Sequence, residues 1–342
     1  MGRLIAGILL LTCLAARGGQ ADVRYPANPV VTPTAVFASH DGVVRFDRDG
    51  GAAIWRSLAG EQTFEPVPVG ERLLVGTSAG LVALDAVSGD PVWRRFAGTS
   101  VFSPTVAGEV AYVAGRDGSL RALDIATGEV RWQRRFTGWV YPPALHGGVL
   151  VTGGQAAELV GLDPQSGEER WRRSLGQELV YRPVAGRHGV FVTTFAGILW
   201  AIDPADGEVR WLHRDDVVSD SPSVVGDELY LPRFDGLVQG FDQASGEGIG
   251  RYRLGSDALM PVSTDEGYVV ASDGAGRVAV LKRQGLVPTS KVELSPAPSL
   301  PPRLCAGHLL WVTEPGPRLE SRPLSVPNHD EMSEVGETAR CR

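Results

Sequence analysis

The chain has 342 residues, 43% of them hydrophobic, which is enough for a sizeable core and argues against global disorder. Its formal net charge of −7 argues against a nucleic-acid-binding protein, because such proteins usually present a basic face. The 43 glycines and 24 prolines follow no collagen-like period, so they indicate many short strands joined by turns.

The first residues, MGRLIAGILLLTCLAARGGQADV, have the features of a secretory signal peptide. Arg3 supplies a positive charge, and the apolar run over residues 4–16 is too short to span a bilayer as a stable helix. Gly19 and Ala21 are small residues at positions −3 and −1 of a cleavage site. We therefore predict that residues 1–21 are a signal peptide and that the mature protein is exported.

The three cysteines leave two questions open. Leu10-Leu11-Thr12-Cys13 is similar to the lipobox of bacterial lipoproteins, although Thr12 stands where Gly, Ala or Ser is usual. Cys13 is either a lipid anchor or a residue lost with the signal peptide. Cys305 and Cys341 lie in the mature chain, and an oxidising compartment would allow them to pair.

A repeat of 38 to 40 residues extends over most of the remaining sequence, and LDIATGEVRW (residues 123–132) is one copy of its most regular part. Each clear copy has Gly four residues after an Asp, and five copies have Trp eight residues after it. The repeated residues are Asp47, Trp55, Asp85, Trp93, Asp124, Trp132, Asp163, Trp171, Asp203, Trp211 and Asp242. Two fainter copies, at residues 276–285 and 317–324, bring the number of copies to eight.

The order of residues within each copy predicts four short strands joined by hairpins, and four strands in about 40 residues are typical of a propeller blade. We therefore predict an all-β fold, an eight-bladed β-propeller of four-stranded antiparallel blades over residues 22–325, with seven blades as the alternative. The last copy lacks a convincing fourth strand, which residues 22–25 could supply. Residues 326–342 form a polar tail that we expect to be disordered.

The repeated residues are predicted to be structural, because a catalytic residue would occur once and these occur in nearly every blade. Asp124 is expected to accept hydrogen bonds from the backbone of the loop that follows it. Gly128 is expected to supply the positive φ that closes this loop. Trp132 is expected to place its flat ring against the neighbouring blade.

The sequence Ala-Leu-Asp-x-x-Thr-Gly-x-x-x-Trp (residues 122–132) resembles the repeat of the pyrroloquinoline quinone (PQQ)-like, or quinoprotein-type, propellers. One branch of that family implies a dehydrogenase that oxidises alcohols or sugars with PQQ and calcium. The other branch, the BamB-type assembly lipoproteins of Gram-negative bacteria, implies an eight-bladed scaffold without a cofactor.

Several features favour the scaffold branch. Many alcohol-oxidising members stack the quinone against a disulfide between adjacent cysteines, which this chain lacks, and the chain is shorter than is usual for those enzymes. The sequence shows no metal-ligand spacing of histidines and no nucleophile or phosphate-binding motif. We therefore expect a non-enzymatic protein with no catalytic, cofactor-binding or metal-binding residues; a PQQ-dependent dehydrogenase is the disfavoured alternative.

The resemblance implies a cell-envelope scaffold, in the periplasm or on the periplasmic face of the outer membrane, that binds the barrel subunit of the outer-membrane assembly machinery through one end of the propeller. An interaction module of another envelope or secretion complex is the alternative. Nucleic acid is not expected as a partner, and contact with the membrane is expected only through a lipid on Cys13.

One position differs between the blades in a way that suggests a binding surface. An aromatic residue lies two residues before the aligned proline in four successive copies, and an arginine follows the last of them: Phe64, Phe102, Tyr141, Tyr181 and Arg182. Clustered aromatic residues with an arginine are typical of protein-binding hot spots. We predict that these five residues form part of a partner surface; the alternative is that the rings only pack between blades.

Overall fold

The computed structural model describes residues 29–39, 41–48, 51–265, 267–305, 307–313 and 317–324. The predicted signal peptide, the lipid-anchor candidate Cys13, residues 22–25 and the polar tail lie outside these residues, so what the sequence indicates about them stays a prediction. Cys305 is disulfide-bonded. Its partner is not among the described residues, so the pairing with Cys341 also stays a prediction. The described residues contain no helix long and apolar enough to cross a membrane.

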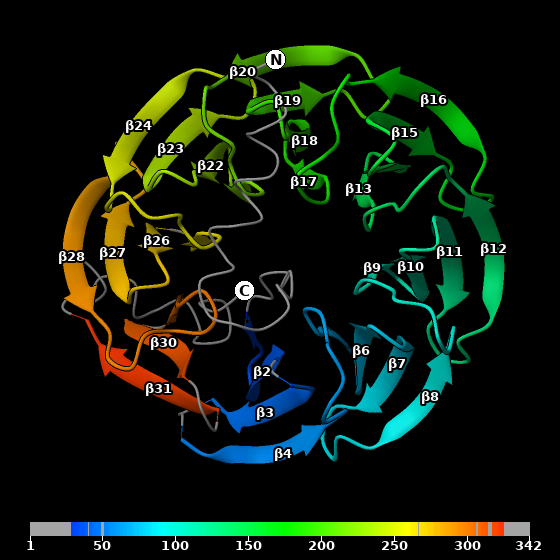
Figure 1. The fold of residues 1–342 in the computed structure, drawn as a ribbon, viewed down its shortest axis with the longest axis horizontal. Helices are drawn as coiled ribbons and strands as arrows, with labels where there is room; N and C mark the ends of the chain where they lie inside the picture. The colour runs from blue at the N-terminus through cyan, green and yellow to red at the C-terminus, as the bar shows by residue number, and fades with distance from the viewer. Residues whose placement is uncertain are drawn as a thin grey trace, which may run out of the picture.

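The described strands form eight antiparallel sheets arranged in a ring, which confirms the eight-bladed β-propeller (Figure 1). In every sheet the strands follow one another in chain order from the central channel to the rim. Seven blades have four strands and the last has three among the described residues.

The innermost strands are β1 (Val30–Val31), β5 (Val67–Val69), β9 (Thr105–Ala107), β13 (Ala144–His146), β17 (Val184–Gly186), β21 (Ser223–Val225), β25 (Ser263–Thr264) and β29 (Arg303–Cys305). The second strands are β2 (Ala35–Ser39), β6 (Arg72–Thr77), β10 (Val110–Ala114), β14 (Val149–Gly153), β18 (Gly189–Thr194), β22 (Glu228–Pro232), β26 (Tyr268–Ser272) and β30 (His308–Thr313). The third strands are β3 (Val43–Asp47), β7 (Gly80–Asp85), β11 (Ser119–Asp124), β15 (Glu158–Leu162), β19 (Ile198–Ile202), β23 (Leu237–Asp242), β27 (Arg277–Lys282) and β31 (Arg318–Pro323). The outermost strands are β4 (Ala53–Ser57), β8 (Pro91–Arg95), β12 (Val130–Arg135), β16 (Glu169–Ser174), β20 (Val209–Arg214), β24 (Gly248–Arg253) and β28 (Val287–Glu293).

The hydrophobic core lies between the blades. The second and third strands are covered by a neighbouring blade on each face, so they are nearly continuous apolar runs; β7, for example, is buried at every residue except Asp85. The outermost strands have one face toward a neighbour and one toward solvent, so burial alternates along β12. This alternation explains why the charged residues of the repeat collect on the rim.

The repeat tryptophans join each of the first five blades to the next one in the chain. Trp132 of β12 donates its indole N–H to the carbonyl of Pro164 in the following blade, at 3.0 Å. Trp93, Trp171 and Trp211 make the same bond to the residue that follows the repeat Asp of the next blade. Each ring also covers a repeat glycine of that loop. Because these contacts recur from blade to blade, they set a common spacing around the ring.

The loop between the third and outermost strands is closed by its Asp and Gly. Asp124 accepts hydrogen bonds from the backbone N–H groups of Ala126 and Thr127, both at 3.0 Å, and an ion pair from Arg131 at 2.7 Å. These bonds keep the carboxylate charged: the Arg131 guanidinium, followed by the Thr127 N–H, lowers the pKa of Asp124. The carboxylate is therefore engaged within its own loop and strand.

The ring closes between its last and first blades. Gly51, just before β4, forms a two-way backbone pair with Leu319 of β31, with N–H to O distances of 2.9 and 3.2 Å. In Figure 1 the red β31 and the blue first blade lie side by side at this junction. Among the described residues, this pair provides the backbone hydrogen bonds across the junction of β31 with the first blade.

Candidate functional site in the central channel

The innermost strands hold one another at a fixed spacing around the channel. A hydroxyl near the start of one innermost strand donates to a carbonyl at the start of the next: Thr105 to Pro143 at 2.5 Å, and Ser263 to Pro302 at 2.6 Å. Ser223 makes the corresponding bond to Val262 at 2.6 Å. These bonds position the connecting segments that lead into the innermost strands. The segments surround one end of the channel.

A cavity of about 290 Å³ lies at this end of the channel, within the size range of small-molecule sites. Its wall is formed by residues from the second to the eighth blade. All five residues of the predicted partner surface lie in this wall, namely Phe64, Phe102, Tyr141, Tyr181 and Arg182. The structure therefore brings the five together, although Phe64 and Arg182 are more than 100 residues apart in the sequence.

Three of the four rings are packed rather than exposed. Phe64, Phe102 and Tyr141 are 4%, 4% and 5% exposed, with ring centroids 5.2 and 5.6 Å apart in that order. The hydroxyl of Tyr141 donates to the carbonyl of Val180 in the next blade at 3.0 Å. Tyr181 is half-buried and Arg182 is exposed, so these two offer the accessible part of the predicted surface.

Three further charged residues line the cavity besides Arg182, namely Glu65, Asp220 and Arg303. Arg182 lies 3.9 Å from Glu65 at the cavity wall. Arg303, at the start of β29, donates from Nε to the carbonyl of Pro29 at 3.2 Å. Burial lowers the pKa of the Arg303 guanidinium, and the charge of Glu65 opposes this shift.

The most unusual group in the cavity wall is Asp220. Asp220 lines the cavity, and only 4% of its surface is exposed to solvent. One carboxylate oxygen accepts a hydrogen bond from the N–H of Ser221 at 2.5 Å, and no cationic side chain among the described residues pairs with it. Burial raises the pKa of Asp220 from its ordinary 3.8 to about 7, although the Ser221 N–H acts in the opposite direction. A buried carboxyl with such a pKa is a candidate functional group.

Asp220 and Arg303 were not predicted as site residues, although the sequence contains a signal for both. Asp220 occupies the position two residues before the proline where four other blades have an aromatic ring. Arg303 follows Pro302 directly, where the other blades have small or apolar residues such as Val67 and Ala144. A comparison of every repeat position would therefore have found both.

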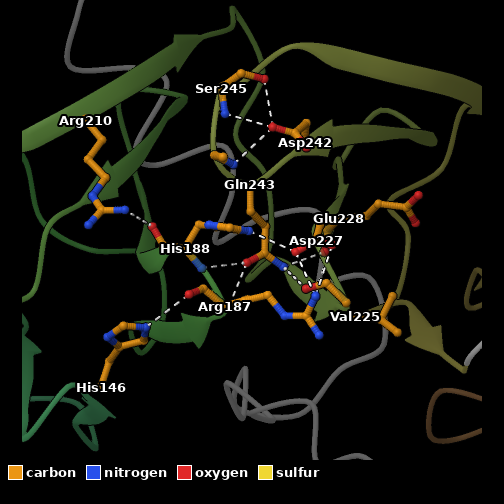
Figure 2. Close-up of polar contacts among 12 residues, drawn as sticks. His146, Arg187, His188, Arg210, Val225, Asp227, Glu228, Asp242, Gln243 and Ser245 are labelled. Carbon is orange, nitrogen blue, oxygen red and sulfur yellow. Dashed lines mark hydrogen bonds and ion pairs between the residues drawn. The ribbon is translucent and has the colours of Figure 1, made fainter.

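A second polar cluster lies at the other end of β17, between the fifth and sixth blades (Figure 2). Gln243 is fully buried; its carbonyl oxygen accepts from the N–H groups of Arg187 and His188 at 2.8 and 3.3 Å, and its amide donates to two backbone carbonyls. His188 and Arg187 in turn donate to Asp227, at 2.8 and 3.0 Å. Because these groups satisfy one another, the cluster fits a structural link between the two blades better than a ligand site.

The described residues contain no group of three or more His, Cys, Asp or Glu side chains placed to hold a metal ion.

Comparison with known proteins agrees with this geometry. The family model described as outer membrane protein assembly factor BamB matches residues 39–138 and 134–293, which is most of the chain. The chain belongs to the BamB family. No curated protein matches the sequence.

Two solved structures share the fold of this BamB-family chain. BamB from Moraxella catarrhalis is 20% identical, with a TM-score of 0.70 over 86% of this chain and 96% of that one. The computationally designed Ika8 protein is 11% identical, with a TM-score of 0.78 over 88% of this chain and 98% of that one. At these identities the likeness concerns the fold alone.

Proposed function

We propose that this BamB-family protein is a non-enzymatic scaffold of the cell envelope that assists outer-membrane protein assembly by binding the barrel subunit of the assembly machinery. The observation that carries the proposal is the family match over residues 39–293, which includes the greater part of the propeller. The predicted export of the chain to the periplasm agrees with this role.

The end of the propeller that contains the cavity is the better candidate for the binding face. Phe195, in the hairpin between β18 and β19, is 47% exposed and is the only aromatic among the exposed large hydrophobic residues that the structure describes. Its N–H donates to Glu178 in the segment that leads to Tyr181 and Arg182, so these residues adjoin. Exposed aromatic residues beside an arginine favour protein binding.

A neighbouring pair extends the same face. Arg116, in the hairpin of the third blade, places its guanidinium 5.5 Å from the ring of Trp139, in the segment that leads to Tyr141. Trp139 is half-buried, so part of its ring is free to contact a partner. The face therefore combines rigidly held aromatic groups with arginines, which fits a partner surface of mixed apolar and acidic character.

Crosslinked pull-down from cell envelopes tests the role. The wild-type protein is expected to recover the outer-membrane assembly barrel subunit, and Phe195→Ala and Arg182→Glu are each expected to reduce its recovery at least about fivefold, as for interface residues worth more than about 1 kcal/mol. Leu212→Ala is the matched control, because Leu212 is similarly exposed in the same blade but lies on the outermost strand. Failure of the wild type to recover the barrel subunit would refute the role, and equal recovery by all variants would refute the face.

A further inference from the structure

Two oppositely charged groups line the central cavity without forming an ion pair with each other. The carboxylate of Asp220 has one hydrogen bond, from the N–H of Ser221. The guanidinium of Arg303 has one, from Nε to Pro29, and its two Nη groups have no acceptor among the described residues. Burying a charged group without a partner is unfavourable, and groups of this kind in a cleft cluster at functional sites.

The cavity has the size and the walls for a small polar ligand. A sphere of about 290 Å³ is about 8 Å across, which accommodates a chain of about six to eight heavy atoms. The wall includes the half-buried Tyr181, in the blade next to the one that carries Asp220. Aromatic faces attract organic cations, so the Asp220 side of the cavity is suited to an ammonium group.

We propose that this cavity binds a small zwitterion, a molecule carrying one ammonium and one carboxylate group, with the ammonium on Asp220 and the carboxylate on Arg303. The charge of Glu65 acts on Arg303, but Glu65 also pairs with Arg182, and no cationic side chain among the described residues pairs with Asp220. A zwitterion would give Asp220 and Arg303 one direct partner each. A guanidinium is suited to a carboxylate, because its N–H groups can donate two parallel hydrogen bonds. Glu65 and Arg182 lie close to each other, so they compensate one another near the site.

This chemistry is shared by free amino acids and short peptides. The distance between the two charges distinguishes the candidate ligands. It is short in glycine and longer in 4-aminobutanoate and 6-aminohexanoate. In triglycine, peptide groups separate the two charges. The proposal is independent of the scaffold role, since it uses residues inside the cavity and not the exposed face around Phe195.

Isothermal titration calorimetry on the full-length mature protein tests the proposal at pH 8, above the pKa of Asp220. The probes are glycine, 4-aminobutanoate, 6-aminohexanoate and triglycine, with hexylamine and hexanoate as analogues that carry one charge. At least one zwitterion is expected to bind in a 1:1 ratio, at least tenfold tighter than both analogues, which is about 1.4 kcal/mol.

Matched variants connect the binding to the two residues. We expect Asp220→Asn and Arg303→Gln each to weaken binding at least tenfold. Asn keeps the size of the Asp220 side chain and an acceptor for the Ser221 N–H. Asp216→Asn and Arg251→Gln, at exposed positions outside the cavity, are expected to bind as wild type. Thermal melting of each variant checks that it is folded. The proposal is overturned if no zwitterion binds at about 10 mM, if hexylamine or hexanoate binds as tightly as the best zwitterion, or if folded Asp220→Asn binds as wild type.

Discussion

Replacing Asp220 with Asn should raise the unfolding free energy of the propeller, relative to that of the wild type, more at pH 8 than at pH 4. Burial raises the pKa of Asp220 from 3.8 to about 7, so the folded state binds this proton more tightly than the unfolded chain. The stability that this group contributes is therefore complete below pH 3.8 and is lost as the pH rises through about 7. Asn keeps the acceptor for the Ser221 N–H and has no proton to lose, so the variant lacks this pH dependence.

The size of the effect follows from the shift of about three pH units. Each unit corresponds to about 1.4 kcal/mol, so the difference in unfolding free energy between Asp220→Asn and the wild type should grow by about 4 kcal/mol between pH 4 and pH 8. Most of this change should occur below pH 7, because above pH 7 Asp220 loses its proton in the folded state as well as in the unfolded chain.

Urea denaturation followed by circular dichroism, at intervals between pH 4 and pH 8, measures this difference directly. Other titrating groups are common to both proteins and cancel. Asp216→Asn, in the same connecting segment but exposed, is the matched control for replacing an aspartate by an asparagine. A constant difference for Asp220→Asn would refute the argument that burial holds its proton.

Two further substitutions, Gly207→Ala and Tyr141→Phe, test how the blades are joined, and Gly176→Ala is the control for the first. Gly207 has a φ of +77° and an added Cβ would lie 2.5 Å from the ring of Trp171, so Gly207→Ala should cost about 2–5 kcal/mol of unfolding free energy. Gly176 has a φ of +72° with open space around it, so Gly176→Ala should cost only about 1–2 kcal/mol; equal losses in urea denaturation would show that the Trp171 contact contributes nothing. Tyr141→Phe should cost about 1 kcal/mol, because the carbonyl of Val180 loses its donor, and an unchanged unfolding midpoint would show that this bond between blades is energetically neutral.

The blade architecture could be predicted because it depends on short residue patterns that recur along the chain. The interval from Asp124 to Gly128 to Trp132 predicts a loop and the strand after it, and its recurrence predicts eight blades, with seven as the alternative. The direction of the contacts was not predictable in the same way. Nothing in one copy shows that Trp132 reaches the loop of Pro164 in the following blade and not the preceding one.

The candidate site depends on contacts that no local pattern contains. Asp220 and Arg303 are 83 positions apart, and the packing of three successive blades around the channel places both in one cavity wall. The aromatic series was visible in the sequence, and packing of its rings between blades was one of the two alternatives. Which of the rings are buried could not be predicted, because it depends on how closely the blades that carry Phe64, Phe102 and Tyr141 approach at the channel. Sequence reasoning therefore located this end of the propeller but not its charged interior.

The tryptophan contacts give the ring a direction. Each of the first five blades places a tryptophan against the next blade, as Trp171 reaches Pro204 while the loop of Pro164 receives Trp132. Such a head-to-tail interface would continue as an open spiral unless its rotation happened to close. The number of blades is then set by the angle at one repeated joint, so a change that opened every joint slightly would alter the number of blades in a closed ring.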